Sequence, residues 1–400
     1  MIKDNHCGRI EKAFNRRELL QRAGGGIGML ALNSLLIGKG EATTNIGPNP
    51  MAARHPHGFG NAKRVIWLFI NGGPSHVDTW DYKPGLEKAN GKKLEGFDNT
   101  TGFFDKAVGP LLKSPFEFKQ YGNSGMWASS IFPHLSQHVD KMAFIKSFHT
   151  KSNNHSPALF MANTGVPRMS NPCVGSWVTY GLGTENQNLP AFVVMSDPLN
   201  RGLPKGHAAN WGSGFLPGAF QGTWVRSKGE PIPNLKRIAG LSDQQQRAQL
   251  DFVGKLNAIH EKRYPEETQL TARIKSFELA YRMQQEAPEC FEIGNEPEHI
   301  KSLYGIGEKR CAHFARQCLM ARRMIERGVR FVQIYSGGME NARSWDGHGD
   351  IRKNHTQFAG ETDQPIAGLL ADLEQRGMLD ETLVIWGGEF GRLPVSQLSG

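Results

Sequence analysis

The sequence predicts an α/β fold in which a mostly parallel sheet is sandwiched between helices. Two observations support this class. Five apolar runs that are too short for helices recur along the chain, and segments with helical periodicity lie between them. Continuous apolar runs are typical of strands buried on both faces, and strands that alternate with helices indicate a parallel sheet. With 400 residues, 38% of them hydrophobic, the chain can bury a large core.

The first predicted strand, Arg64–Ile70, ends at a turn sequence of Asn, Gly, Gly and Pro. The other predicted strands are Met142–Phe148, Ala191–Met195, Val329–Tyr335 and Thr382–Trp386. Helices are expected from about Ser156-Pro157, where proline suits a first turn, and over roughly Glu308–Arg327 and Thr356–Arg376.

A long segment after the third predicted strand, about residues 198–300, is interpreted as an insertion. Its first part, Pro198–Pro233, is rich in Gly, Pro and aromatic residues and is expected to form a long loop that shapes the pocket. Its second part, Ser242–Glu286, is polar with helical periodicity. Together they are expected to form a loop and helical cap on the sheet.

Charge and cysteine content exclude two classes of protein. The net charge of +9 is spread over 47 basic and 38 acidic residues without a basic run among aromatic side chains, so no nucleic-acid partner is expected. The five cysteines show neither CxxC nor zinc-ribbon spacing, which excludes a disulfide scaffold. Cys311 and Cys318 lie seven residues apart on one face of a predicted helix, where buried thiols are expected.

Residues 1–42 are interpreted as a twin-arginine export signal. Arg16 and Arg17 precede an apolar, glycine-rich segment from Ala23 to Gly38 that contains no acidic residue. This segment is shorter than the roughly 20 residues that span a bilayer, so no stable membrane span is expected. The alternative is an amphipathic helix with a chance arginine pair, which the run of glycines disfavours. Residues 43–62 would be a linker, and residues 63–400 the main domain.

Ligand-type side chains follow four of the predicted strands. Because ligands of open parallel sheets bind beyond the carboxyl ends of the strands, these side chains are expected at one edge. They are His76 and Asp78 after the first strand, His149, His155 and Ser156 after the second, Asp346, His348 and His355 after the fourth, and Glu389 with Arg392 after the last.

Carboxylates together with imidazoles suit zinc, manganese or iron, and a pair of such ions can clamp the attacking and leaving oxygens of a phosphoryl or sulfuryl transfer. The amides at the start of the Ser156 helix would favour an anion. Each residue also has a simpler interpretation. A single His after a strand is usually a hydrogen-bonded loop residue, and Glu389 could pair only with Arg392.

Four segments resemble those of the domain-of-unknown-function 1501 family. They are RVIWLFINGGPSHVD (64–78), CLMARRMIERGVRFVQIY (318–335), WDGH (345–348) and DETLVIWGGEFGRLP (380–394). Members of that family are exported bacterial proteins, often labelled sulfatase, with a fold similar to that of the alkaline phosphatase and sulfatase superfamily. The resemblance covers nearly everything from about residue 60 onward and implies an alkaline phosphatase-like sheet.

The resemblance also implies roles for single residues. Sulfatases begin their nucleophile helix with Cys or Ser, then x-Pro-x-Arg, whereas this chain has His155 at the nucleophile position and Leu159 at that of the arginine. His155 could act as nucleophile, general base or metal ligand, and Ser156 is the alternative nucleophile. Asn71 stands at the position of a metal carboxylate, and Asp78 or His76 would supply the charge that Asn71 lacks.

Late positions of the superfamily pattern are also matched. Asp346 and His348 correspond to its late metal ligands, and Glu389 stands where the next acidic ligand is expected. Arg392 would help to hold an anionic substrate. In the family a Gly-Arg-Asp-His type segment comes after the Glu-Phe-Gly-Arg motif, and this chain ends eight residues after Arg392. The domain is therefore expected to lack its C-terminal part.

These observations predict an exported, periplasmic or extracellular, metal-dependent hydrolase of phosphate or sulfate esters. The expected cofactor is a divalent ion, zinc, manganese or calcium. The expected partners are an anionic ester, either a small molecule or a polysaccharide, and the twin-arginine export machinery. The alternative is a binding or surface-assembly protein without turnover, which Asn71, the missing Cys or Ser nucleophile and the missing final segment favour.

A reporter fused to residues 1–45 should be exported, and Arg16→Lys combined with Arg17→Lys should abolish its export, because the arginine pair is the feature that the export receptor reads. Cell fractionation measures both. Export that survives the double substitution would contradict the signal assignment.

Overall fold

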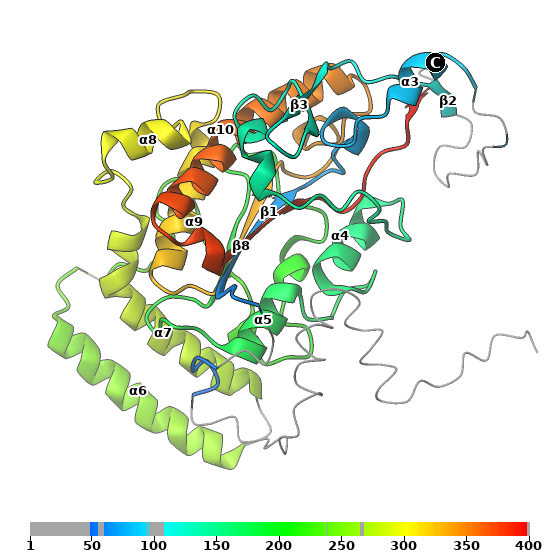
Figure 1. Ribbon diagram of the computed structural model, residues 1–400. Helices are drawn as coiled ribbons and strands as arrows, with labels where there is room; N and C mark the ends of the chain where they lie inside the picture. Colours follow the sequence, from blue (N-terminus) through cyan, green and yellow to red (C-terminus); the bar gives the residue numbers. More distant parts are fainter. Residues whose placement is uncertain are drawn as a thin grey trace, which may run out of the picture.

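A five-stranded parallel sheet forms the centre of the structure (Figure 1). The computed structural model describes residues 49–54, 60–93, 96, 108–237, 239–264 and 268–397. The strand order is β6–β5–β7–β1–β8, and each neighbouring pair is parallel. The bounds are β1 Arg64–Ile70, β5 Phe192–Met195, β6 Thr223–Trp224, β7 Phe331–Ser336 and β8 Thr382–Gly387. The predicted α/β class with a mostly parallel sheet is therefore confirmed.

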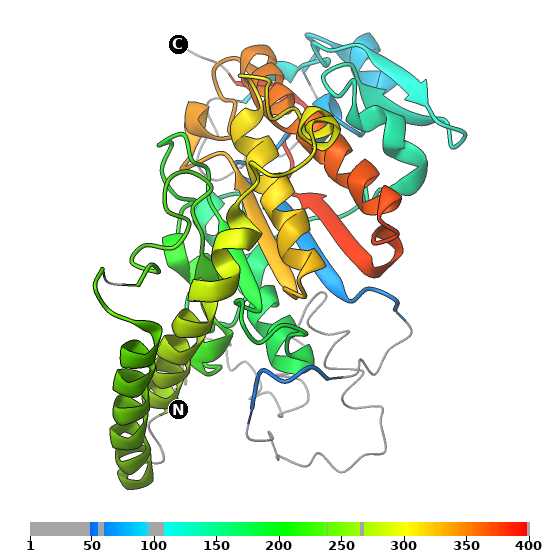
Figure 2. The ribbon, with the colours of Figure 1, turned by 90° about the vertical axis from the view of Figure 1, so that its left-hand side faces the viewer.

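Helices and two short antiparallel pairs of strands surround this sheet (Figures 1 and 2). The helices are α3 Pro84–Ala89, α4 His155–Thr164, α5 Val174–Leu182, α6 Asp243–Arg263, α7 Thr268–Phe291, α8 Glu298–Tyr304, α9 Ala312–Glu326 and α10 Ile351–Gln375. The pairs are β2 Val108–Leu111 with β9 Val395–Gln397, and β3 Phe118–Tyr121 with β4 Met126–Ser129.

The sheet has a hydrophobic core on each face, because successive side chains of a strand point to opposite sides. Ile66 and Leu68 of β1 belong to the larger core, which includes apolar side chains of α9 and α10. Phe69 of β1 and Tyr335 of β7 belong to the other core, together with Leu159 of α4. Helices on both faces thus explain why the strands read as continuous apolar runs.

The predicted strand Met142–Phe148 is wrong. The segment follows the 3-10 helix η2, Leu135–Lys141, and contains no strand. Phe144 packs against the larger core, whereas Ile145 is 74% exposed and Phe148 is 86% exposed. Apolar content alone cannot distinguish such a segment from a buried strand, because it does not show whether a pairing partner exists.

The predicted insertion contains both a loop and helices. In the Pro198–Pro233 stretch, the two-residue strand β6 pairs with β5 and extends the sheet, which no sequence pattern of that length could reveal. The predicted helical segment is divided into α6 and α7, which lie side by side (Figures 1 and 2). No residue of α6 is buried, whereas Met283 and Cys290 of α7 enter the larger core. The C-terminal end of α7 therefore anchors this pair of helices.

Two further expectations concern the thiols and the N-terminal segment. Cys311 and Cys318 are buried and free, as expected, with Cys311 at the N-cap of α9 rather than within the helix. The export signal predicted for residues 1–42 lies outside the described residues, as does most of the 43–62 linker. None of the helices in the described part of the chain is long and apolar enough to cross a bilayer.

A buried arginine joins three of the helices that cover the sheet. Arg322 of α9 is 1% exposed, and its guanidinium lies 2.8 Å from Glu296 and 2.9 Å from Asp372 of α10. It also donates a 2.6 Å hydrogen bond to Glu326. Tyr304 of α8 donates to the same Asp372 carboxylate at 2.9 Å. Buried charges are tolerated only when they are paired in this way.

Replacing Arg322 with Met should lower the free energy of unfolding by about 3 kcal/mol, because the buried carboxylates of Glu296 and Asp372 would lose their buried partner and keep only the more exposed Arg323 and Arg376. Arg376→Met is the matched control. Arg376 pairs with the same Asp372 but is 31% exposed, so its loss should cost less than about 1 kcal/mol. Chemical denaturation measures both variants, and equal losses would contradict the role given to Arg322.

Candidate metal and anion site

The candidate site lies at the carboxyl ends of three neighbouring strands. Because β1 pairs with β7 on one side and with β8 on the other, the segments that follow these strands meet at one edge of the sheet. Asn71 follows β1, Asp346 lies on the segment after β7, and Glu389 follows β8. His155, the first residue of α4, adds its side chain from a further segment of the chain. This is the edge at which the sequence predicted a site.

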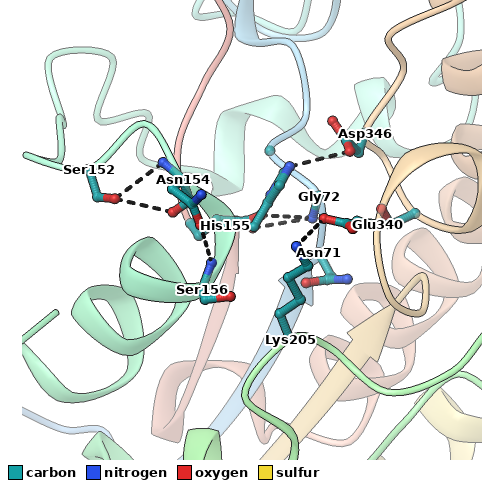
Figure 3. A network of polar contacts seen from close by, with 12 residues as sticks. Asn71, Gly72, Ser152, Asn154, His155, Ser156, Lys205, Glu340 and Asp346 are labelled. Atoms are coloured by element: carbon teal, nitrogen blue, oxygen red, sulfur yellow. Dashed lines mark hydrogen bonds and ion pairs between the residues drawn. The ribbon is translucent and has the colours of Figure 1, made fainter. Parts of the chain in front are cut away.

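His155 bridges two carboxylates. Figure 3 shows its contact with one of them, Asp346. Its Nδ1 lies 2.7 Å from Oε1 of Glu389, and its Nε2 lies 3.3 Å from Oδ2 of Asp346. Burial disfavours the imidazolium, but the hydrogen bonds to Asp346 and Glu389 outweigh burial and raise the pKa of His155 to about 9. His155 is therefore a cation at neutral pH in this arrangement.

Asp346 is surrounded by several polar partners. Its Oδ1 lies 2.8 Å from Nε2 of His348 and 2.5 Å from Nη2 of Arg392. Its Oδ2 accepts the backbone N–H of Asn341 at 2.8 Å. Burial alone would raise the pKa of Asp346, but His155, His348 and Arg392 hold it far below its usual range. The carboxylate is therefore ionised at any pH at which the protein would work.

Glu389 is held by the glycine turn after β1. Its side chain is fully buried, and both of its oxygens accept the Gly72 N–H, at 3.1 and 3.2 Å. Gly72 has φ of +110°, and a Cβ there would lie 2.6–2.7 Å from atoms of Ser344, Trp345 and Asp346. Only glycine fits this approach. The turn thus fixes Glu389 and Asp346 relative to each other.

Asn71 contributes a buried acceptor. It is 1% exposed, and its Nδ2 donates to the carbonyls of Gly338 and Met339. Its Oδ1 is buried and has no hydrogen-bond donor among the described residues. A buried oxygen left in this state is the kind of atom that a bound cation or water satisfies.

Arg392 is engaged by the protein itself. Beyond Asp346, its Nε donates to the Gly73 carbonyl at 2.7 Å, and its Nη2 donates to the Gly72 carbonyl. The guanidinium lies over the Phe390 ring, 5.6 Å from the centroid. Its side chain is 21% exposed, so part of it still faces the cleft.

Of the other predicted residues, His76, Asp78 and Ser156 have partners of their own. His76 accepts the backbone N–H of Arg392 at 3.3 Å, and burial lowers its pKa. Asp78 is buried and accepts the Ser75 hydroxyl at 2.5 Å. Ser156 follows His155 in α4, and its backbone N–H is capped by Asn154 at 3.2 Å. His149 is exposed on the segment that was predicted to follow a strand.

His355 binds the turn after β1 from the α10 side. It is fully buried in α10, and its Nε2 accepts the Ser75 N–H at 2.9 Å. Its ring packs edge-on against Trp345. Burial disfavours the charged ring and lowers the pKa of His355 to about 3, with a smaller contribution from Arg392. His355 is therefore a neutral acceptor in the structure rather than a ligand.

The ligand atoms of His155, Asp346 and His348 all lie within 4.8 Å of one another. They line a cleft of about 2490 Å³. Two residues that the sequence did not single out line the same cleft, Lys205 and Glu340, and they form an ion pair at 2.5 Å. The long loop was expected to shape the pocket, but nothing in its composition distinguished Lys205 from its other polar residues.

A second group of ligand-type residues, Asp197, His313 and Glu361, has the same spacing. Here Arg201 lies between the carboxylates, 2.9 Å from Asp197 and 2.7 Å from Glu361, with its guanidinium 4.7 Å from the Phe358 centroid. This arginine comes from the long loop after β5. The group therefore serves to fasten that loop to α10.

Comparison with known proteins gives a family but no activity. Residues 62–400 match a family described as protein of unknown function (DUF1501). No curated protein matches the chain, and no solved structure does either. The chemistry of the site therefore has to be inferred from its geometry.

His355→Gln should make the protein less sensitive to acid. An unfolded His has a pKa near 6.5, so the stability that neutral His355 contributes is complete above pH 6.5 and is lost as the pH falls toward 3. At pH 4.5 this loss is on the order of 2–3 kcal/mol. Gln keeps an acceptor for the Ser75 N–H but does not titrate.

Denaturation of the wild type and His355→Gln at pH 7.5 and 4.5 measures the effect. The difference between the two pH values should be smaller in the variant by about that amount. The same loss in both proteins would show that His355 is not buried as a neutral ring.

Proposed function

The chain belongs to the DUF1501 family, and from the geometry of its site we propose that it is a metal-dependent hydrolase of phosphate or sulfate esters. The observation that carries the proposal is the convergence of His155, Asp346 and His348, with ligand atoms within 4.8 Å, at the carboxyl edge of a parallel sheet. We further propose that the sheet is of the alkaline phosphatase and sulfatase type, which the resembling segments favour.

The donor set fits a transition metal. Imidazole nitrogens together with carboxylate oxygens favour zinc or manganese over calcium, which prefers oxygen ligands alone. His155, Asp346 and His348 would hold the ion, and the free Oδ1 of Asn71 offers a further oxygen on the adjacent turn. When bound, the ion would supply positive charge to the oxygens of the ester during transfer.

Glu389 would orient His155 rather than bind the ion. Oε1 of Glu389 lies 2.7 Å from Nδ1 of His155, so the other ring nitrogen, Nε2, is directed at Asp346 and the cleft. A carboxylate on the outer nitrogen of a metal-binding imidazole fixes the ring and raises its basicity. Since Glu389 is itself held by the Gly72 N–H, the orientation of His155 derives from the turn after β1.

The protonation of His155 bears on its three predicted roles. With a pKa of about 9, the ring holds its proton at neutral pH and cannot act as a base or nucleophile in that form. As a metal ligand it would exchange the Nε2 proton for the ion and keep the Nδ1 proton, which it donates to Oε1 of Glu389. The geometry therefore favours the ligand role over the nucleophile role.

A second candidate function is binding or surface assembly without turnover. One observation favours it. Arg392 and His155 already neutralise Asp346, at 2.5 and 3.3 Å, so the pocket is electrically satisfied by its own side chains. Asn71 adds no charge where a carboxylate would strengthen metal binding.

We also propose that the protein is exported to the periplasm or the outside of the cell, with the twin-arginine machinery as a partner. The arginine pair at positions 16 and 17 carries this proposal. An anionic ester, small or polymeric, would then be met outside the cytoplasm.

Purified protein should carry about one zinc or manganese ion per site, and Asp346→Ala with His348→Ala should remove it. Elemental analysis measures the metal content. His313→Ala is the matched control, because it removes a histidine from the Asp197 and Glu361 group and should leave the content unchanged. Folded wild-type protein without stoichiometric metal would exclude the hydrolase proposal, and retention by the double variant would move the site elsewhere.

Turnover of a panel of phosphate and sulfate monoesters then separates the two functions. Asp346→Ala should lower kcat/KM by at least about 100-fold, since even outer partners of a metal ligand cost 10–100-fold. A metal-loaded protein that hydrolyses no ester of the panel would favour the binding function.

A further inference from the structure

Lys205 and Glu340 form a partly exposed ion pair inside the cleft. Lys205 Nζ lies 2.5 Å from Oε2 of Glu340, and the side chains are 33% and 27% exposed. Figure 3 shows Lys205 reaching from its loop toward Glu340, beside Asn71 and Gly72. The pair therefore lies next to the turn that holds the candidate metal site.

The backbone on the lysine side is fixed. The Lys205 carbonyl accepts Nδ2 of Asn210 at 2.7 Å, and Asn210 is fully buried. Gly206 has φ of +88°, and a Cβ there would lie 2.6 Å from the ring of Phe160. The loop thus rests directly on α4, the helix that begins with His155. The backbone at Lys205 is therefore held in place, and Lys205 can reach a different partner only through its side chain.

The backbone on the glutamate side is fixed as well. The N–H of Met339 donates to the Arg201 carbonyl at 3.1 Å, and Arg201 is held by Asp197 and Glu361. On the other side of Glu340, the Asn341 N–H binds Oδ2 of Asp346 at 2.8 Å. Glu340 is therefore placed within one residue of a contact to the candidate metal ligand.

Lys205 and Glu340 have opposite effects on an anion that enters the cleft. The lining of the cleft includes other carboxylates, among them Asp346 and Glu389, so Glu340 adds to the negative charge that disfavours an anionic ligand. Lys205 would attract such a ligand, but Glu340 neutralises it. An exposed pair of this kind contributes little net stability, so a phosphate or sulfate group could replace Glu340 at Lys205 without a large penalty.

We propose that Lys205 binds the phosphate or sulfate group of the substrate and that Glu340 is an internal competitor for Lys205. The inference rests on the proposed function, in that it takes the anionic ester as the ligand of this cleft. Glu340 then sets a threshold: groups with enough charge to displace it are bound, and neutral or weakly anionic groups are rejected. Lys205 is the binding residue, and Glu340 determines specificity.

The test uses inorganic phosphate and inorganic sulfate as probes, titrated calorimetrically into the full chain with matched metal content. Lys205→Met should weaken the affinity for both anions by about tenfold. Glu340→Gln should tighten it by about fivefold, because Lys205 is no longer neutralised. Glu381→Gln is the control for the change of charge, since Glu381 pairs with Lys63 at the opposite end of β8, and it should change affinity by less than about twofold.

The double variant decides whether Glu340 acts through Lys205. If it competes for Lys205, the gain from Glu340→Gln should fall below about twofold in the Lys205→Met background. The same gain in both backgrounds would overturn the proposal, because Glu340 would then act only by repulsion through space. An unchanged affinity in Lys205→Met would overturn it as well.

These affinities do not depend on turnover, so the two proposals can fail separately. Anion affinities that follow the predicted pattern in a protein that hydrolyses no ester would support the Lys205 site and reject the hydrolase function. If the protein hydrolyses esters but neither Lys205→Met nor Glu340→Gln changes its anion affinity, the hydrolase function is supported and the Lys205 site is rejected.

Discussion

The close packing of the glycine turn after β1 is the constraint on which the site depends. Gly72 donates its N–H to Glu389 on the segment after β8, while the space of its missing Cβ is filled by Ser344, Trp345 and Asp346 on the segment after β7. One residue therefore fixes the spacing between the two carboxylates that hold His155. Arg392 reinforces the same turn through the carbonyls of Gly72 and Gly73. A side chain at position 72 would disturb all of these contacts at once.

The charges of the site are balanced, and one of them can change. Asp346 and Glu389 carry two negative charges, and His155 and Arg392 carry two positive charges, which sum to zero. If His155 gives up its proton, the same four residues carry a net charge of −1 in the buried end of a cleft. A buried negative charge is costly unless a cation joins it. The group is thus neutral with the proton and attractive to a metal ion without it.

The sequence predicted the parts of the fold and site that depend on local pattern. β1, β7 and β8 were visible as apolar runs, and parallel strands place their following residues at one edge. The features that the sequence did not predict depend on contacts between distant segments. Met142–Phe148 has the composition of a strand but forms no strand, and β6 has only two residues, which pair with β5. Lys205 belongs to a loop that is held to α10 through Arg201 and Glu361, which lie 160 residues apart.

Composition also fails to separate the two groups of Asp, Glu and His residues, although the structure does. In both, a cation already lies against the carboxylates. At the Asp197 and Glu361 group that cation is Arg201, which stays charged at every accessible pH, and hydrogen bonds to both carboxylates raise its pKa further despite its burial. At Asp346 and Glu389 the bridging cation is His155, which can lose its proton. A metal ion can replace a proton on imidazole but not on guanidinium. The same residue types therefore hold a loop in place at Asp197 and Glu361, and form a candidate metal site at Asp346.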